Sequence, residues 1–292
     1  MPYNKTLQKT ESKKTCSSNR PLVILLIIAL AAVFLSQNNA VAATITVPDD
    51  FKTISEAVEK AVANDTVIVK AGSYSDNIVI KKPVTLTAIS GSAATLIKAA
   101  KAGEPVIKAQ DASNVTISGF TVSGSELAGI YINNVSDSFI TKNAAVKNTI
   151  GILVKRSHRN TISGNNADHN EVEGISLDSS SGNTIEKNTA NENMDKGFFF
   201  NDSDGNSIIG NSANLNTWNG MTFYSSDKNI IKDNMTLRNT FGLVISEAKE
   251  NVESGNTTVP NIFVIFPILL VYIGVLWYLV QKNLFKFIYR AK

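Results

Sequence analysis

The two consecutive segments GILVKRSHRNTISGNNADHNEVE (151–173) and GISLDSSSGNTIEKNTANENMDK (174–196) carry glycine, isoleucine and asparagine at the same offsets. The pattern extends from Gly129 to Val244, with glycines spaced 22, 23, 23, 23 and 22 residues apart. These glycines are Gly129, Gly151, Gly174, Gly197, Gly220 and Gly242. A period of this length indicates a repeat architecture in which each unit packs on its neighbours.

The arrangement within one period selects the type of repeat. Apolar residues follow each glycine at the first and third positions, and the eleventh is always isoleucine: Ile140, Ile162, Ile185, Ile208, Ile231. Short alternating runs broken at asparagine or glycine predict three strands of two to four residues per period. Such coils, with about 22–23 residues each and stacked about 4.8 Å apart, form an all-β parallel β-helix solenoid.

Asparagine recurs at the fourteenth position of every period, in the column Asn143, Asn165, Asn188, Asn211, Asn234. Asparagine tolerates the left-handed backbone conformation and bonds to nearby backbone, which suits a turn between strands. Amides stacked in register can also bond from coil to coil. We therefore interpret this column as a structural turn ladder and not as an active site.

The chain before the repeats divides into two parts. Residues 1–42 contain a basic start, an apolar run at 21–35 and the small-residue motif Ala40-Val41-Ala42, which is typical of a secretory signal peptide; an uncleaved anchor is the alternative. The β-helix domain is expected at 43–246. Within it, apolar residues at helical spacing predict a short amphipathic helix at about 51–63, started by Thr53 and Glu56, which would cap the first coil.

The chain after the repeats reads as a polar linker (247–261), a transmembrane helix (262–280) and a basic cytoplasmic tail (281–292). The segment IFVIFPILLVYIGVLWYLV has no charge and is long enough for one span. Positive residues without acids follow it, so the β-helix would face the outside of the cell, extracellular or periplasmic, with the C-terminus in the cytoplasm.

The segment TISEAVEKAVANDTVIVKAGSYSDNIVIKKPVTLTA (53–88) and the repeats that follow resemble the NosD-like branch of right-handed parallel β-helix proteins, within the pectin-lyase-like superfamily. The resemblance covers nearly all of 46–246. It implies the right-handed β-helix fold, whereas the repeat residues build the helix and do not specify a function. The NosD name also implies an accessory role in copper delivery to a metalloenzyme.

The charge balance argues against a nucleic-acid partner. The whole chain carries a net charge of +3, but nine of the 28 basic residues and only one of the 25 acids lie in 1–42 and 281–292. The segment between these flanks holds 19 basic and 24 acidic residues, a net charge of −5. Proteins that bind nucleic acid need a basic surface.

Catalytic candidates are few. Asp178 and Asp202 lie on adjacent coils and, with Asp204, are the carboxylates that could converge for acid–base chemistry or calcium binding. The closely grouped aspartates with arginine of pectate lyases and the Asp-Pro-His-Asp motif of alginate epimerases are both missing from the sequence. A polysaccharide lyase or epimerase therefore remains an alternative rather than the primary hypothesis.

Metal binding is weakly indicated. The segment NDSDGNS (201–207) resembles the start of a calcium loop, but its twelfth position is Ala213 instead of glutamate. Copper prefers imidazole or sulfur ligands, and His169 with Met194 is the best available pair on consecutive coils. We expect no cofactor, with calcium and copper as low-probability alternatives.

Aromatic residues favour a binding function. Tyr131, Phe199, Tyr224 and Trp218 are expected on or beside one outer face, where rings can stack on sugars. The sequence therefore predicts a surface-anchored, non-catalytic scaffold whose elongated face binds a polysaccharide or another cell-envelope component. The alternatives are the lyase or epimerase and the NosD-like accessory protein; ligand identity and oligomeric state are not determined by the sequence.

Overall fold

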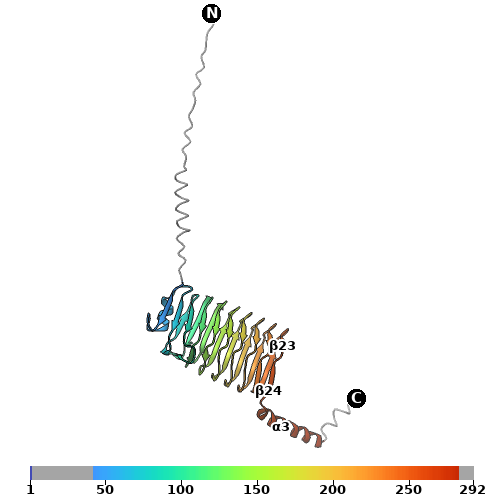
Figure 1. Ribbon diagram of the computed structural model, residues 1–292. Helices are drawn as coiled ribbons and strands as arrows, with labels where there is room; N and C mark the ends of the chain where they lie inside the picture. Colours follow the sequence, from blue (N-terminus) through green and yellow to red (C-terminus); the bar gives the residue numbers. More distant parts are fainter. Residues whose placement is uncertain (2–41, 283–292) are drawn as a thin grey trace. The chain divides into compact units, whose positions relative to one another are not determined.

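The computed structural model describes Met1 and residues 42–282, except for the side chains of 264 and 265. The expected signal peptide and most of the expected cytoplasmic tail lie outside these residues. Figure 1 shows the described chain winding through successive coils, with strands of neighbouring coils side by side. Every pairing between named strands is parallel.

The strands of successive coils assemble into long sheets. The ten-stranded sheet contains, in order, β1 (Thr44–Val47), β2 (Thr66–Val69), β5 (Thr85–Ala88), β8 (Thr116–Ser118), β11 (Phe139–Thr141), β14 (Thr161–Ser163), β16 (Thr184–Glu186), β18 (Ser207–Ile209), β20 (Ile230–Lys232) and β23 (Val252–Ser254). The eight-stranded sheet contains β4 (Ile78–Ile80), β7 (Ile107–Ser113), β10 (Ala128–Ser136), β13 (Ile150–Lys155), β15 (Glu173–Asp178), β17 (Lys196–Asn201), β19 (Asn219–Tyr224) and β22 (Phe241–Ser246).

The third side of the coils is less regular. It contains a four-stranded sheet of β3 (Gly72–Ser75), β6 (Thr95–Lys98), β9 (Thr121–Ser123) and β12 (Ala144–Ala145), and a two-stranded sheet of β21 (Met235–Asn239) and β24 (Thr257–Pro260). Single bridges through Asn166, Thr189 and Ser212 connect the two sheets. The architecture is the predicted all-β parallel β-helix.

The repeat columns build the interior. The isoleucine column is fully buried, as are Ile130, Ile152, Ile175, Phe198 and Met221 from the position after each glycine. Phe200 and Phe223 stack on adjacent coils with ring centroids 4.3 Å apart. Each coil thus contributes the same few side chains to one continuous core, and burying each large apolar side chain stabilises the fold by about 1.5–3 kcal/mol.

The recurring glycines are required by close packing. A Cβ atom on Gly174 would lie 2.6 Å from the Cβ of Ala190 and 2.8 Å from the amide nitrogen of Asn193. No left-handed conformation is involved at Gly174, because it is not among the glycines with positive φ. The glycine column therefore exists because the chain passes too close to the next coil for any side chain.

The left-handed turn positions differ from the expectation. The ladder asparagines themselves do not have positive φ. Positive φ is found instead at the residue before each of them: Lys142, Gly164, Lys187, Gly210, Asp233. The asparagine side chain instead supports the turn by hydrogen bonding across coils. The backbone reversal and the side-chain ladder are thus performed by neighbouring residues.

The N-terminal helix is shorter than expected. Helix α2 (Ile54–Lys60) starts at Thr53, whose hydroxyl accepts a hydrogen bond from the Glu56 backbone N–H at 3.2 Å. It buries Ile54, Ala57 and Val58 and packs against β4, β1 and β2. The helix therefore covers the first coil. Strand β1, which precedes the helix in the chain, pairs with β2, which follows it.

The segment 247–261 is not a linker. It forms β23 and β24, which pair with β20 and β21. Asn251 and Asn256 continue two asparagine columns by accepting hydrogen bonds from the backbone N–H groups of Asn229 and Asn234 at 2.8 and 3.0 Å. The solenoid consequently extends one coil beyond the expected end at 246, because the asparagine spacing continues after the apolar pattern weakens.

The predicted transmembrane helix at 262–280 is not confirmed. A helix, α3 (Ile262–Gln281), does begin at Asn261 and contains Pro267. No helix in the described part of the chain proves long and apolar enough to cross a membrane.

Candidate functional site: the outer face of the eight-stranded sheet

The register of the eight-stranded sheet stacks its outward side chains in columns. The central column is Val79, Lys108, Tyr131, Leu153, Ser176, Phe199, Thr222, Val244. A flanking column, two residues further along each strand, is Gln110, Asn133, Lys155, Asp178, Asn201, Tyr224, Ser246. We call the surface made by both columns the outer face.

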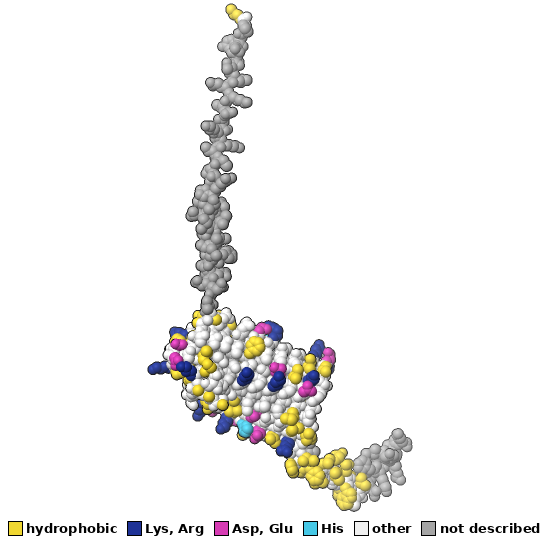
Figure 2. Space-filling view, viewed as in Figure 1, with side chains coloured by type: hydrophobic (Ala, Val, Ile, Leu, Met, Phe, Trp, Pro, Cys, Tyr) yellow, Lys and Arg dark blue, Asp and Glu magenta, His cyan; other side chains and the backbone are white. Residues whose placement is uncertain are grey.

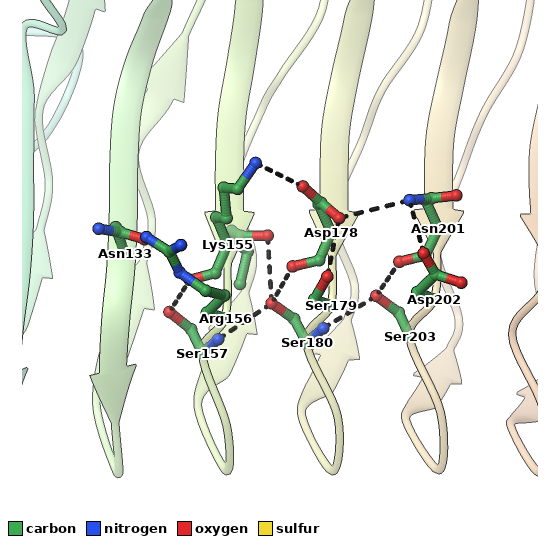
Figure 3. A network of polar contacts seen from close by, with 11 residues as sticks. Asn133, Lys155, Arg156, Ser157, Asp178, Ser179, Ser180, Asn201, Asp202 and Ser203 are labelled. Carbon is green, nitrogen blue, oxygen red and sulfur yellow. Dashed lines mark hydrogen bonds and ion pairs between the residues drawn. The ribbon is translucent and has the colours of Figure 1, made fainter.

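Asp178 lies at the centre of a polar network on the flanking column. Lys155 Nζ lies 2.7 Å from Asp178 Oδ2, and the Asn201 side-chain amide donates to Asp178 Oδ1 at 3.3 Å. The hydrogen bond from Lys155 is the main cause that lowers the pKa of Asp178. Figure 3 shows these side chains in a row on neighbouring strands.

Asp202 approaches the same network, whereas Asp204 does not. The Asn201 amide also donates to Asp202 Oδ2 at 3.3 Å, so one amide bridges the two carboxylates. Asp204 accepts a hydrogen bond from the Asp227 backbone N–H at 2.8 Å and supports a turn. Asp178 is therefore an ionised, paired carboxylate, which suits hydrogen bonding more than proton transfer.

Glu173 is a second carboxyl group next to the central column, and it is less exposed to solvent than Asp178. It is 8% exposed, and this burial raises its pKa, although a hydrogen bond from Ser176 and the charge of Lys196 act in the opposite direction. Lys196 Nζ lies 3.9 Å from Glu173 Oε1 and 2.5 Å from Asp195 Oδ2. The Lys196 ammonium also lies 4.9 Å from the centroid of the Phe199 ring.

The aromatic candidates fall into two groups. Tyr131 and Phe199 belong to the same central column, are half-buried, and are three coils or about 14 Å apart. Lys108 Nζ lies 5.8 Å from the Tyr131 ring centroid. A lysine ammonium group therefore lies over each of the two rings, Lys108 over Tyr131 and Lys196 over Phe199. Tyr224 lies in the flanking column and is 40% exposed, whereas Trp218 precedes β19 at the corner and is 55% exposed.

The asparagine ladder is buried and fully engaged. Asn188 accepts from the backbone N–H of Asn165 at 2.9 Å and donates to the carbonyl of Ile162 at 2.8 Å and to Asn211 Oδ1 at 3.1 Å. The members Asn143, Asn165, Asn211 and Asn234 make equivalent bonds. These amides have no free capacity for a ligand and hold the coils in register.

Three of the side chains considered as metal ligands, those of His169, His158 and Asn206, have other partners in the described structure. His169 Nε2 faces Glu192 Oε2 at 3.4 Å, and Met194 is exposed on the surface. The second histidine, His158, accepts a backbone hydrogen bond from Ser181 through Nδ1 at 3.2 Å. No group of three or more His, Cys, Asp or Glu side chains within 42–282 is arranged to hold a metal ion. Asn206, which lies within the segment 201–207 that resembles the start of a calcium loop, accepts a hydrogen bond from the Asn183 backbone N–H at 2.8 Å.

Sequence reasoning missed Glu173, Asp195 and Lys196. The register pairs the residues that precede consecutive glycines, and it brings Glu173 beside Lys196. The signal was present as an acid and a base in equivalent positions of consecutive repeats. The burial of Glu173 could not be predicted, because the repeat pattern does not determine how side chains of neighbouring coils pack on it.

The architecture defines the class of protein as a right-handed parallel β-helix. The family model described as "Periplasmic copper-binding protein (NosD)" matches residues 58–265. This match covers more than half of the chain, so the chain belongs to the NosD family.

Solved structures agree on the fold. The crystal structure of the periplasmic alginate epimerase AlgG is similar with a TM-score of 0.52 and 14% identity, covering 68% of this chain and 60% of that one. Pectate lyase Pel9A is similar with a TM-score of 0.53 and 16% identity, covering 68% of this chain and 64% of that one. The chain thus spans less than two thirds of either enzyme. No curated protein sequence matches it.

Proposed function

We propose that this domain is a non-catalytic β-helix scaffold that binds an extended carbohydrate chain along its outer face. The observation that carries the proposal is the alignment of Tyr131 and Phe199 in one outward column of parallel strands. Aromatic faces pack well on the apolar faces of sugar rings, and their stiff side chains lose little conformational freedom on binding.

The spacing of the coils supports an extended ligand. Neighbouring strands are about 4.8 Å apart, which is similar to the advance of one hexose in an extended β-1,4-linked chain. Three coil steps separate Tyr131 from Phe199, so sugars about three residues apart would meet the two rings. A ligand lying along the central column would therefore meet one new outward side chain at each coil.

The flanking column supplies hydrogen-bonding groups for hydroxyls. Asn133, Lys155, Asp178 and Asn201 present amide, ammonium and carboxylate groups on four consecutive strands (Figure 3). Figure 2 shows charged side chains of both signs among broad uncharged areas on the visible surface of the solenoid. Such a mixed polar surface offers hydrogen-bonding groups for carbohydrate hydroxyls.

The family description supports a position outside the cytoplasm, because it calls the family periplasmic. A polysaccharide or another component of the cell envelope is the partner that this location provides. We favour the carbohydrate proposal over an accessory role in copper delivery because Tyr131 and Phe199 lie in one outward column of parallel strands.

The proposal is tested by replacing Tyr131 and Phe199 with alanine in the full chain. Saturation-transfer NMR with a panel of neutral and acidic oligosaccharides should show binding to the unmodified protein and at least tenfold weaker binding to the double variant. Phe139→Ala is the matched control, because Phe139 is an exposed aromatic residue on the ten-stranded sheet. Equal weakening by Phe139→Ala, or no binding to the unmodified protein, would refute the assignment.

A second candidate function is a polysaccharide lyase or epimerase, and Glu173 is the observation that favours it. A buried carboxyl group with a raised pKa beside a lysine can serve in proton transfer. Incubation of neutral and uronate polysaccharides with the protein, followed by proton NMR, separates the two candidates. New unsaturated or inverted-sugar signals that disappear in Glu173→Gln would identify an enzyme.

A further inference from the structure

A depression of about 450 Å³ lies where the capping helix meets the first strand of the eight-stranded sheet. It is lined by Ser55, Val58 and Glu59 from α2, and by Asn77, Val79, Lys81 and Lys82 from β4 and its flanks. None of these residues belongs to the aromatic pair. The depression therefore lies apart from the aromatic pair, although Val79 is the first member of the central column.

The depression is in line with the central column. Val79 lines it and pairs with Lys108, which pairs with Tyr131 on the next strand. β4 is the first strand of the sheet, and α2 packs against it. A polymer lying along the central column would consequently meet the capping helix at this point and could not continue past it.

The charges near the depression differ from those further along the face. Lys155 and Lys196 form ion pairs with Asp178 and Asp195. Among the described residues, Lys81 and Lys108 have no carboxylate partner within 4 Å. Lys82 is already engaged, since it donates to the backbone carbonyls of Glu59 and Ala61 and fastens the helix.

The remaining polar groups of the depression limit what it can bind. The Asn77 side-chain oxygen accepts a hydrogen bond from the backbone N–H of Lys101 at 2.7 Å. The Ser55 hydroxyl donates to the Asp76 carboxylate at 2.7 Å. Glu59 is exposed on the helical rim and can accept hydrogen bonds from hydroxyls. An anionic ligand would therefore be held by Lys81 at the depression and by Lys108 one strand further along.

We propose that the depression between α2 and β4 binds the terminal sugar of an acidic polysaccharide, with Lys81 and Lys108 engaging carboxylate groups of the last residues. This inference rests on the proposed carbohydrate function and specifies its ligand class and its orientation: one chain end lies against the helix, and the chain extends toward Phe199. Helix α2 then closes the outer face at the β4 end, and the depression there recognises one end of the polysaccharide chain.

The ligand class is tested by calorimetric titration of the full chain with a galacturonic acid hexamer and with a neutral β-1,4-glucan hexamer at low ionic strength. Lys81→Gln should weaken binding of the acidic hexamer about two- to fivefold, as expected for an exposed ion pair, and leave the neutral hexamer unchanged. Lys108→Gln should weaken binding of the acidic hexamer by a larger factor than binding of the neutral hexamer, because Lys108 also lies over the Tyr131 ring. Lys98→Gln is the control, because Lys98 is exposed on β6 of another sheet.

The chain-end assignment is tested by attaching a bulky fluorophore to either end of the acidic hexamer. Binding should fall at least tenfold with one labelled end and persist with the other. Equal binding of both labelled forms would overturn the closed end, and equal affinity for the neutral and acidic hexamers would overturn the ligand class while the proposed function stands. Absence of binding by every oligosaccharide would overturn both.

Discussion

Lys155 and Asp178 lie on adjacent strands of the eight-stranded sheet, and the ammonium nitrogen is 2.7 Å from Oδ2 of the carboxylate. The pair occupies the middle of the flanking column, between Asn133 and Asn201. Both groups remain partly exposed, so solvent screens the pair and its contribution to stability is at most about 1 kcal/mol. Its main effect is to keep Asp178 charged and oriented at the surface.

Replacement of Lys155 by methionine should raise the pKa of Asp178 toward its ordinary value of 3.8, because the hydrogen bond from Lys155 is the largest cause of the lowered pKa. A depressed carboxyl pKa contributes stability above the unfolded value, and this stability is lost as the pH falls through the folded pKa. The carboxyl carbon titration of Asp178, followed by NMR between pH 2 and 5, measures the shift. An unchanged titration in Lys155→Met would contradict the pairing.

Glu173 should show the opposite pH dependence. Its pKa is raised above 4.5, chiefly by burial, so folding stability falls as the pH rises from the unfolded value through the folded pKa. Glu173→Gln should therefore unfold at a higher temperature than the unmodified protein at pH 7.5, and at the same temperature at pH 3.5. The unfolding midpoints at both pH values check this. A loss of stability at pH 7.5 would show that the ion pair with Lys196 outweighs burial.

Removal of one ladder amide should be strongly destabilising. Asn188→Ala leaves the Ile162 carbonyl and the Asn165 N–H without their partners inside the solenoid, which should cost about 2–4 kcal/mol of unfolding free energy. Asn133→Ala is the control, because Asn133 accepts its hydrogen bond from Arg156 at the surface, and its cost should stay within about 0.5 kcal/mol. Urea denaturation measures both. Similar small losses in the two variants would show that the ladder does not bind the coils together.

The fold was largely predictable because each repeat position has one physical task. The buried isoleucines, the tight glycines and the asparagine column recur at fixed spacing, so the coil and its inward face follow from the sequence. The last coil was missed because 247–261 lacks the strong apolar pattern, although Asn251 and Asn256 continue the ladder spacing. Asparagine spacing is thus a better guide to the end of this solenoid than hydropathy.

The candidate site was less predictable. The outward columns that contain Tyr131, Phe199 and Asp178 follow from the strand alternation, but side-chain pairing across coils does not. Glu173 is buried beside Lys196, and Lys196 also lies over Phe199. Such arrangements depend on which rotamer a long side chain adopts, and a repeat pattern contains no information on that choice. The depression beside α2 requires the position of the helix as well.

The glycine column provides a direct test of coil packing. Gly174→Ala should destabilise the protein by about 1–3 kcal/mol, because the new Cβ would overlap the Cβ of Ala190 and the carbonyl oxygen of Ala167. Ala190→Gly removes one of these overlaps, so the double variant should be more stable than the sum of the single effects predicts, by about 0.5–1 kcal/mol. Gly205→Ala is a contrasting case, since its strain arises from φ of +60° with open space around it, and Ala190→Gly should not relieve it. Urea unfolding of the two pairs of variants distinguishes close packing from backbone strain, and strict additivity for Gly174 and Ala190 would show that the neighbouring coil shifts to accept the methyl group.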